Sequence, residues 1–323
     1  MHRRIETGTS SVGHIAVVGA GFIGQSWAIV FARSGYDVAL YDADPSQCAK
    51  AGVFLDQALS QLEEAGLLNG LTPQAVRERI VPADALSHAL DGAFYVQENA
   101  PEKLDLKRQI FAELDELAEP GVILASSTSA LLPTSFTEGL KGAARCIVAH
   151  PINPPHLVPA VEVVPGRSTS QETIERTAAL MDAVGQSTVI MRREIDGFII
   201  NRLQGALLHE AFHLFAEGYA DTESIDICVR DGLGLRWSFM GPFETIDLNA
   251  PGGISDYIER YGPFYRQLWQ ENDHLPDWKA CGARLESERG QILARSDMQA
   301  RQVWRDSELM KIASARRRPE QDC

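Results

Sequence analysis

The stretch that decides the fold reads IAVVGAGFIGQSWAIVFARSGYDVALYD and covers residues 15–42. It opens with an apolar run, Ile15–Val18, that leads into the glycine-rich turn Gly19–Gly24. A helix is expected at Gln25–Arg33, followed by a second apolar run, Val38–Tyr41, that ends at Asp42. A strand, a glycine turn, a helix and a second strand closed by an acid are the pattern of a dinucleotide-binding unit.

The glycines of this turn have different tasks. Gly19 allows the tight turn, Gly21 lets backbone N–H groups approach a pyrophosphate, and Gly24 lets the helix pack close to the strand. The helix N-terminus adds a positive potential for the same anion. Because the Asp42 carboxylate would accept from a ribose 2′-OH and repel a 2′-phosphate, the predicted cofactor is NAD rather than NADP. The predicted cofactor-binding residues of this segment are Gly19, Gly21, Phe22, Ile23, Gly24 and Asp42.

The segment allows two other interpretations. A glycine turn can have a purely structural role, and residues 12–32 contain no Asp, Glu, Lys or Arg, as a membrane span would. Three glycines, Gln25 and Ser26 interrupt that apolar character, which favours a strand and a helix in water. The sequence therefore predicts no membrane partner.

The composition is that of an ordinary globular protein. With 323 residues, 45% hydrophobic and 23% charged, the chain exceeds one typical core and suggests two domains. A net charge of −14 argues against nucleic acid as a partner. The five cysteines are scattered without any CxxC pair, which favours a reducing cytoplasm. Residues 1–13 are polar and lack an apolar core, so they are interpreted as a loose leader rather than a signal peptide.

Short β-like runs alternate with helical stretches as far as Glu194. This alternation predicts an α/β, Rossmann-like doubly wound parallel sheet in residues 1–195. The further strands are expected at Ala93–Val96, Val122–Ala125, Cys146–Ala149, Ala160–Val164 and Thr188–Met191.

The pattern changes at Asp196. A long helix, apolar on most sides, is expected at Gly197–Glu217 and is expected to be buried at a domain or subunit interface. Gly232 is interpreted as a helix stop and Pro242 as the first residue of a later helix. Residues 196–323 are therefore predicted to form an all-α C-terminal domain for substrate binding and dimerisation.

Polar residues follow two of the predicted strands. The run Ser126–Ser129 comes after one strand, and His150 ends the next. Ligands bind at the carboxyl ends of sheet strands, so His150 is a catalytic candidate there, although a lone histidine is as often structural. Glu162 lies in the strand that follows, where it can face His150 as an orienting carboxylate.

These segments carry a resemblance over nearly the whole chain. The stretches SSTSALLPTSF (126–136), CIVAHPINPP (146–155), LVPAVEVVPG (157–166), EIDGFIINRLQ (194–204), DGLGLRWSFMGPFET (231–245) and RQVWRDSELM (301–310) resemble the L-gulonate 3-dehydrogenase/λ-crystallin branch of the 3-hydroxyacyl-CoA dehydrogenase family. The resemblance implies NAD-dependent oxidation of a 3-hydroxy acid by a homodimer.

Residue by residue, the resemblance implies roles for six side chains. The catalytic histidine falls on His150, its partner carboxylate on Glu162, and the substrate-side hydroxyl on Ser129. The active-site asparagine falls on Asn201, which places the predicted pocket in the cleft between the two domains. Two further cofactor contacts fall on Glu102 and Lys107, which without the resemblance are ordinary residues of a first helical turn.

The chemistry explains these residue types. As hydride leaves carbon, a base must take the hydroxyl proton, and His150 suits that role near neutral pH. Glu162 would fix the ring tautomer and stabilise the imidazolium, while Ser129 and Asn201 would position the reacting oxygen.

The substrate class is inferred from charge. Residues 55–71 contain Asp56, Glu63 and Glu64 but no lysine or arginine, so a CoA phosphate would be repelled there. Arg236 is predicted to bind the carboxylate of a free 3-hydroxy acid, the alternative being an exposed helix-end charge. L-gulonate is the expected substrate. Carnitine or another 3-hydroxy acid, a short acyl-CoA, a crystallin-like structural role and NADH sensing without chemistry remain as alternatives.

The motif His209-Glu210-Ala211-Phe212-His213 matches HExxH, which on a helix can hold zinc. The motif is short and no third ligand stands out, so buried or interface histidines are expected and no metal is predicted.

Overall fold

The computed structural model describes residues 13–270, 287, 290–291 and 293–316. Nearly all of the expected leader, residues 1–13, lies outside the described residues. The chain forms two compact units, one of Met1–Ile199 with Val303–Cys323 and one of Ile200–Gln302. The end of the chain thus groups with the first unit, whereas the sequence places it in the second domain.

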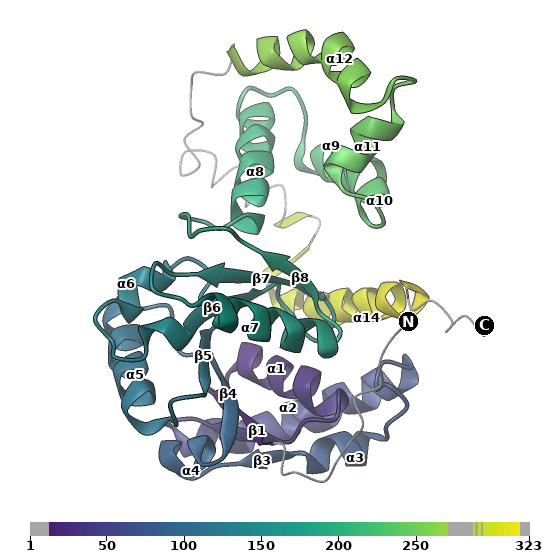
Figure 1. The fold of residues 1–323 in the computed structure, drawn as a ribbon. Helices are drawn as coiled ribbons and strands as arrows, with labels where there is room; N and C mark the ends of the chain where they lie inside the picture. Colours follow the sequence, from purple (N-terminus) through teal and green to yellow (C-terminus); the bar gives the residue numbers. More distant parts are fainter. Residues whose placement is uncertain (1–12, 271–286, 288–289, 292, 317–323) are drawn as a thin grey trace, which may run out of the picture. The chain divides into compact units, whose positions relative to one another are not determined.

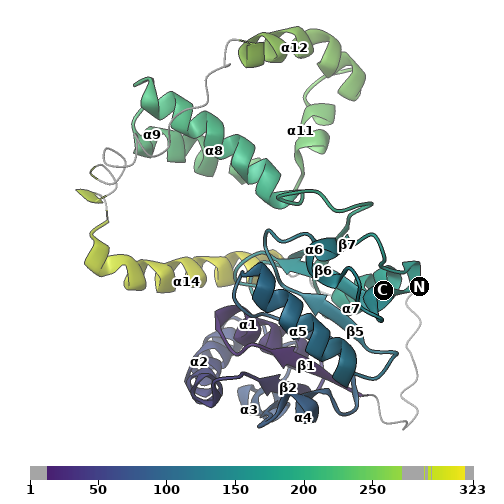
Figure 2. The same ribbon diagram turned by 90° about the vertical axis from the view of Figure 1, so that its left-hand side faces the viewer.

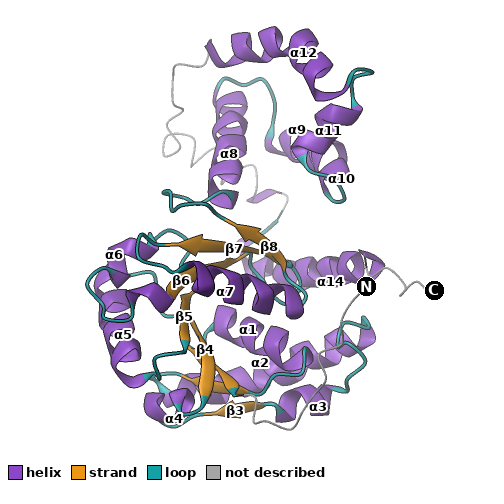
Figure 3. Cartoon of the chain, in the orientation of Figure 1, coloured by secondary structure: helices purple, strands orange, loops and turns teal. Residues whose placement is uncertain are grey.

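The first unit is built on an eight-stranded sheet with the order β3-β2-β1-β4-β5-β6-β7-β8 (Figure 1, Figure 3). Its strands are β1 His14–Val18, β2 Val38–Tyr41, β3 Ile80–Pro82, β4 Ala93–Glu98, β5 Ile123–Ser126, β6 Cys146–Pro151, β7 Ala160–Pro165 and β8 Ser187–Ile190. The predicted Rossmann-like fold is confirmed. The three-residue edge strand β3 is absent from the sequence prediction, because so short a run has no measurable alternation.

One pair of strands departs from the predicted parallel sheet. β6 and β7 pair antiparallel, while the other neighbours pair parallel. The connection between them, residues 152–159, is shorter than the dozen or so residues that a parallel crossover needs. The chain therefore reverses direction at the carboxyl end of β6, and His150 comes to lie opposite Glu162 in the register.

Helices cover both faces of the sheet (Figure 1, Figure 2). One core cluster packs α1 Phe22–Arg33, α2 Pro45–Glu64 and α7 Gln171–Ala183 against the sheet, and Leu309 and Met310 of α14 (Met298–Arg316) pack against it. The opposite cluster holds α4 Leu86–Leu90, α5 Leu104–Leu117 and α6 Pro133–Thr137. The remaining helices of this unit are α3 Pro73–Glu78 and the 3₁₀ turn Ala143–Arg145.

The described part of the second unit contains helices and no strand, so the predicted all-α character is confirmed (Figure 3). Its helices are α8 Ile200–Ala216, α9 Thr222–Ile227, the π-helix Cys228–Leu233, α10 Gly234–Trp237, α11 Pro242–Leu248, α12 Gly253–Gln270 and the 3₁₀ turn Arg295–Asp297. Pro242 opens α11 as expected.

Two predicted helix boundaries in this region are wrong. The long helix begins at Ile200 and not at Gly197, because Gly197 and Phe198 both have a positive φ that an α-helix excludes. Gly232 does not stop a helix, since the chain passes through it as a π-helix and continues directly into α10. A glycine permits a left-handed stop but does not impose one.

The uncharged segment of residues 12–32 is divided by the glycine turn into β1 and α1. Within the described ranges, no helix combines the length and the apolar character needed to cross a bilayer.

The buried ring of His156 makes the stability of the fold depend on pH. Burial, and secondly the charge of Arg33, lower the pKa of His156 from 6.5 to about 3. Its Nδ1 is buried without a hydrogen-bond partner among the described residues. Because the folded pKa lies below the unfolded one, the unfolded chain binds this proton first, and stability is lost as the pH falls from about 6.5 towards 3.

We expect His156→Leu to remove this pH dependence. Between pH 6.5 and 5, the wild-type free energy of unfolding should fall by about 1.6 kcal/mol relative to that of the variant, since one pKa unit corresponds to 1.36 kcal/mol and the unfolded group is half protonated at pH 6.5. Urea unfolding of both proteins at the two pH values measures this difference. Parallel changes in the two proteins would contradict the assignment.

Candidate active site

The glycine turn is as tight as the sequence predicts. Gly19 has a φ of 97°, and a Cβ there would lie 2.9 Å from the carbonyl of Asn99. A Cβ on Gly24 would lie 1.9 Å from the carbonyl oxygen of Gly19, so α1 can approach β1 this closely only with glycine. A Cβ on Gly21 would meet no atom within 4 Å, which leaves open space beside the turn.

The N-terminus of α1 suits an anionic group. Its N-cap is Gly21, no side chain caps the first turn, and that turn contains no acidic residue. The first N–H groups of the helix therefore carry their positive potential without a carboxylate to neutralise it. Together with the space beside Gly21, this fits the pyrophosphate of NAD.

Asp42 lies directly after β2 and is half-buried. Its Oδ2 accepts from the N–H of Ala20 at 2.7 Å and its Oδ1 from the N–H of Asp44 at 2.9 Å. The carboxylate thus ties the end of β2 to the glycine turn. The ribose contact assigned to Asp42 stays a prediction.

An aromatic wall flanks the turn. The ring of Phe22 packs edge-on against Phe54 of α2 at 5.4 Å, and Phe54 packs against His156 at 6.2 Å. His156 also lines a cavity of about 880 Å³, to which none of the predicted site residues contributes. The wall connects the nucleotide turn to the loop that follows β6.

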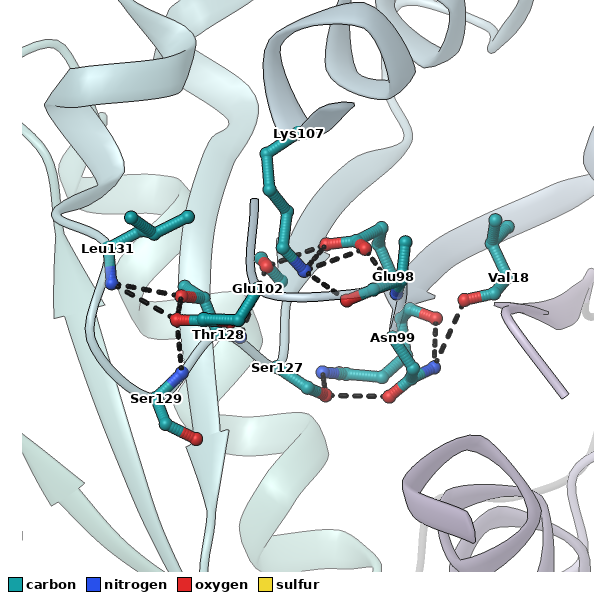
Figure 4. Close-up of polar contacts among 12 residues, drawn as sticks. Val18, Glu98, Asn99, Glu102, Lys107, Ser127, Thr128, Ser129 and Leu131 are labelled. Atoms are coloured by element: carbon teal, nitrogen blue, oxygen red, sulfur yellow. Dashed lines mark hydrogen bonds and ion pairs between the residues drawn. The ribbon is translucent and has the colours of Figure 1, made fainter. Parts of the chain in front are cut away.

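Lys107 is buried beneath the carboxyl edge of the sheet (Figure 4). Its Nζ donates to both oxygens of Glu98 at 2.8 Å and to the carbonyl of Ala100 at 3.0 Å. Glu98 also accepts from the hydroxyl of Ser126 at 2.7 Å. The two Glu98 oxygens and the Ala100 carbonyl thus match the three hydrogens of the Lys107 ammonium group. The cofactor contact assigned to Lys107 stays a prediction. Sequence reasoning missed Glu98, although an acid ending an apolar strand is the signal for it.

Glu102 holds the loop that contains Ser129 (Figure 4). It precedes α5, which begins at Leu104, and so does not belong to the first helical turn. Its Oε1 accepts from the N–H groups of Ser129, Ala130 and Leu131 at 3.2, 2.9 and 3.3 Å, and from the hydroxyl of Thr128. The Ser129 side chain points away from Glu102 (Figure 4).

Ser127 organises a polar network that the sequence did not predict. Its hydroxyl accepts from Trp27 Nε1 at 3.0 Å and from Gln97 Nε2 at 2.7 Å, and donates to Asn99 Oδ1 at 2.7 Å. Asn99 in turn donates to the carbonyl of Val18 at 3.3 Å. The network joins the ends of β1, β4 and β5, and Gln97 within an apolar strand is the signal that could have revealed it.

The structure brings His150 and Glu162 together. The two residues are direct partners in the antiparallel register of β6 and β7, and His150 Nδ1 lies 2.8 Å from Glu162 Oε2. His150 is 3% exposed and Glu162 is fully buried. The other oxygen of Glu162 accepts from the N–H of Ile199 at 2.7 Å, and the ring of Phe198 packs 5.4 Å from that of His150. Neither Phe198 nor Ile199 was a predicted site residue.

The other predicted residues lie in the second unit. Asn201 is half-buried in the first turn of α8, and Arg236 is exposed in α10. His209 and His213 are half-buried in α8, and the described ranges contain no group of three potential ligands placed to hold a metal ion.

Comparison with known proteins agrees with this geometry. Residues 14–195 match the family described as 3-hydroxyacyl-CoA dehydrogenase, NAD binding domain, and residues 197–276 match its C-terminal domain. The chain belongs to the 3-hydroxyacyl-CoA dehydrogenase family. The predictions of an NAD-dependent hydroxy acid dehydrogenase and of NAD as cofactor are thereby confirmed.

Relatives within the 3-hydroxyacyl-CoA dehydrogenase family support the predicted branch. The chain is 43% identical to the lambda-crystallin homolog of Bos taurus over 310 residues, which covers 95% of this chain and 96% of the relative. It is 39% identical to the L-carnitine dehydrogenase of Streptomyces coelicolor, covering 81% and 82%. The structure of an NAD⁺-dependent 5-formyl-3-hydroxy-2-methylpyridine 4-carboxylic acid 5-dehydrogenase is similar with a TM-score of 0.81 and 26% identity, covering 93% and 97%.

We expect the Glu98–Lys107 pair to support the fold of the site. Lys107→Met leaves a buried carboxylate without its cation and should lower the free energy of unfolding by about 3–5 kcal/mol, whereas Lys107→Met with Glu98→Gln should recover part of the loss. As a control, Arg79→Met at the exposed Arg79–Asp37 pair should cost about 0–1 kcal/mol. Urea unfolding measures all three. Equal losses in Lys107→Met and Arg79→Met would rule out a structural role for the Glu98–Lys107 pair.

Proposed function

We propose that the protein oxidises the 3-hydroxyl group of a free 3-hydroxy acid, L-gulonate to 3-dehydro-L-gulonate, with His150 as general base. The contact between His150 Nδ1 and Glu162 Oε2 at 2.8 Å carries this proposal. A carboxylate in this position accepts the Nδ1 proton, which leaves Nε2 as the proton acceptor of the neutral ring.

The surroundings of His150 suit proton transfer. When Nε2 takes the hydroxyl proton of the substrate, the resulting imidazolium lies against the buried carboxylate of Glu162, which stabilises it. Bound NAD supplies the acceptor for the hydride that leaves carbon. Ser129 and Asn201 are proposed to bind the reacting oxygen and hold it towards Nε2.

The topology supports joint use of the turn and the base. The glycine turn follows β1 and His150 ends β6, and β1, β4, β5 and β6 all run parallel, so both features lie at the carboxyl edge of the sheet. Three strand spacings separate them, roughly 14 Å. The ends of β4 and β5 lie between, where Glu98, Asn99 and Ser127 form their polar contacts.

Surface charge supports a free acid over an acyl-CoA. Asp56 pairs with Arg77 of α3 at 3.2 Å. The acidic face of α2 therefore has one counter-charge, which comes from outside residues 55–71. Glu63 and Glu64 are exposed on the same helix and would still repel the phosphates of CoA. Arg236 is exposed and is proposed to bind the substrate carboxylate.

L-carnitine is the second candidate, because the similar L-carnitine dehydrogenases show that closely related chains act on that 3-hydroxy acid. A crystallin-like structural role is the alternative from another class, and turnover with any acid in the panel below decides against it.

We also propose a homodimer formed through the second unit, in a cytoplasmic setting. Support for the dimer comes from large apolar side chains that are exposed in the single chain, among them Leu203, Tyr219, Phe239, Phe243 and Leu248. Sedimentation velocity should give twice the chain mass of 35.5 kDa. The free thiols of Cys48, Cys146 and Cys228 support a reducing compartment.

His150→Gln should lower kcat by about 10²–10⁴-fold, because glutamine cannot accept the proton. NADH affinity, measured by fluorescence titration, should stay within about threefold, since His150 lies three strands from the glycine turn. Stopped-flow and steady-state assays of NADH formation give the rates. A variant that keeps wild-type turnover would refute the base assignment.

A panel of L-gulonate, other sugar acids, L-carnitine and 3-hydroxybutyryl-CoA should identify the substrate. We expect the highest kcat/KM for L-gulonate, and Arg236→Ala should raise KM for the acid about tenfold or more with NAD affinity unchanged. NADH formation at 340 nm is the measurement. Preference for the CoA ester, or an unchanged KM in Arg236→Ala, would overturn the free-acid assignment.

A further inference from the structure

A strained turn lies beside the acid–base pair. Gly197 and Phe198 both have left-handed backbones, with φ values of 77° and 49°. Glycine adopts this conformation freely, but for a bulky residue such as phenylalanine it is an outlier. Phe198 is also fully buried, so the strain is held by the surrounding structure. Such outliers persist where the surrounding structure determines them, and they concentrate at functional sites.

The turn contacts both members of the pair. The backbone of the turn presents the N–H of Ile199 to Glu162 Oε1 at 2.7 Å. The ring of Phe198 packs against that of His150, with centroids 5.4 Å apart and planes at 55°. The hydrogen bond from Phe198 N–H to the carbonyl of Ile195, at 3.0 Å, closes the turn itself. Phe198 thus places a backbone donor against Glu162 and an aromatic ring against His150.

The contact at Glu162 has a geometric consequence. Glu162 is fully buried, so protein donors rather than water orient its carboxylate. The Ile199 N–H holds Oε1, which keeps Oε2 directed at His150 Nδ1. If that N–H moved, the carboxylate could rotate and His150 would lose the partner that fixes its tautomer.

We propose that Phe198 is a positioning residue for the base, an inference that rests on the proposed function of His150. Its left-handed backbone aims the Ile199 N–H at Glu162, and its ring fixes the plane of the imidazole. The residue acts through His150 and Glu162 and touches no reacting atom. A purely structural role, as an ordinary member of the core cluster around α5, predicts a different outcome.

Phe198→Leu tests the proposal against a matched core change, Phe111→Leu. Both phenylalanines are fully buried in the same cluster, but Phe111 packs on Phe136 and not on His150. We expect Phe198→Leu to lower kcat for L-gulonate, or for L-carnitine if the panel selects it, by roughly 10- to 100-fold, because small displacements of a catalytic group are costly. KM and NADH affinity should stay within about threefold. Phe111→Leu should change kcat less than threefold.

A second measurement does not depend on turnover. The low-field proton resonance of His150 Nδ1, assigned by its loss in Glu162→Gln, should shift or broaden in Phe198→Leu and stay in place in Phe111→Leu. If Phe198→Leu does not fold, Phe198→Met carries the same expectations.

The outcomes separate the two proposals. Equal kcat and an unmoved resonance in the Phe198 and Phe111 variants overturn the positioning role while leaving the base intact. Wild-type turnover in His150→Gln overturns the proposed function, whatever the Phe198 variants show.

Discussion

The pairing of His150 with Glu162 across β6 and β7 is the contact on which the site depends. It exists because residues 152–159 are too few for a crossover, which forces the chain to reverse and sets the two side chains opposite each other. A slip of one residue in this register would turn Glu162 to the other face of the sheet. The facing of these two side chains is therefore set by strand pairing.

The rest of the carboxyl edge is organised by polar contacts that bring distant parts of the chain together. Glu98 binds Lys107 and Ser126, Glu102 holds the loop of Ser129, and Ser127 joins three strand ends. The buried carboxylate of Glu98 is matched by donors, as burial requires, while Glu102 is exposed and accepts from the backbone of its loop. This edge is thus held by hydrogen bonds where the strands end and leaves space beside Gly21, an arrangement that suits an anionic cofactor.

Much of the fold and of the candidate site could be predicted from local sequence pattern, whereas the features set by long-range contacts could not. The glycine turn could be predicted because backbone sterics allow few residues at Gly19 and Gly24. His150 and Glu162 could be expected to face each other because they lie in consecutive strands, although the sequence predicted a parallel sheet and not the antiparallel pairing observed. The left-handed backbone of Phe198 could not be predicted, because only the tertiary environment holds a phenylalanine in that conformation. The hydrogen bonds of Glu102 to residues 128–131 could not be predicted, because these partners lie 26 residues or more further along the chain.

The aromatic wall has a consequence for how the molecule would fail. Phe22 of the glycine turn, Phe54 and His156 form a continuous series of edge-on ring contacts that ends in the loop after β6. Uptake of a proton by His156 would put a charge among these rings, next to Arg33. Because the folded pKa of His156 is about 3, this charge would appear only in strong acid, where it would disturb the packing that links the glycine turn to the loop after β6.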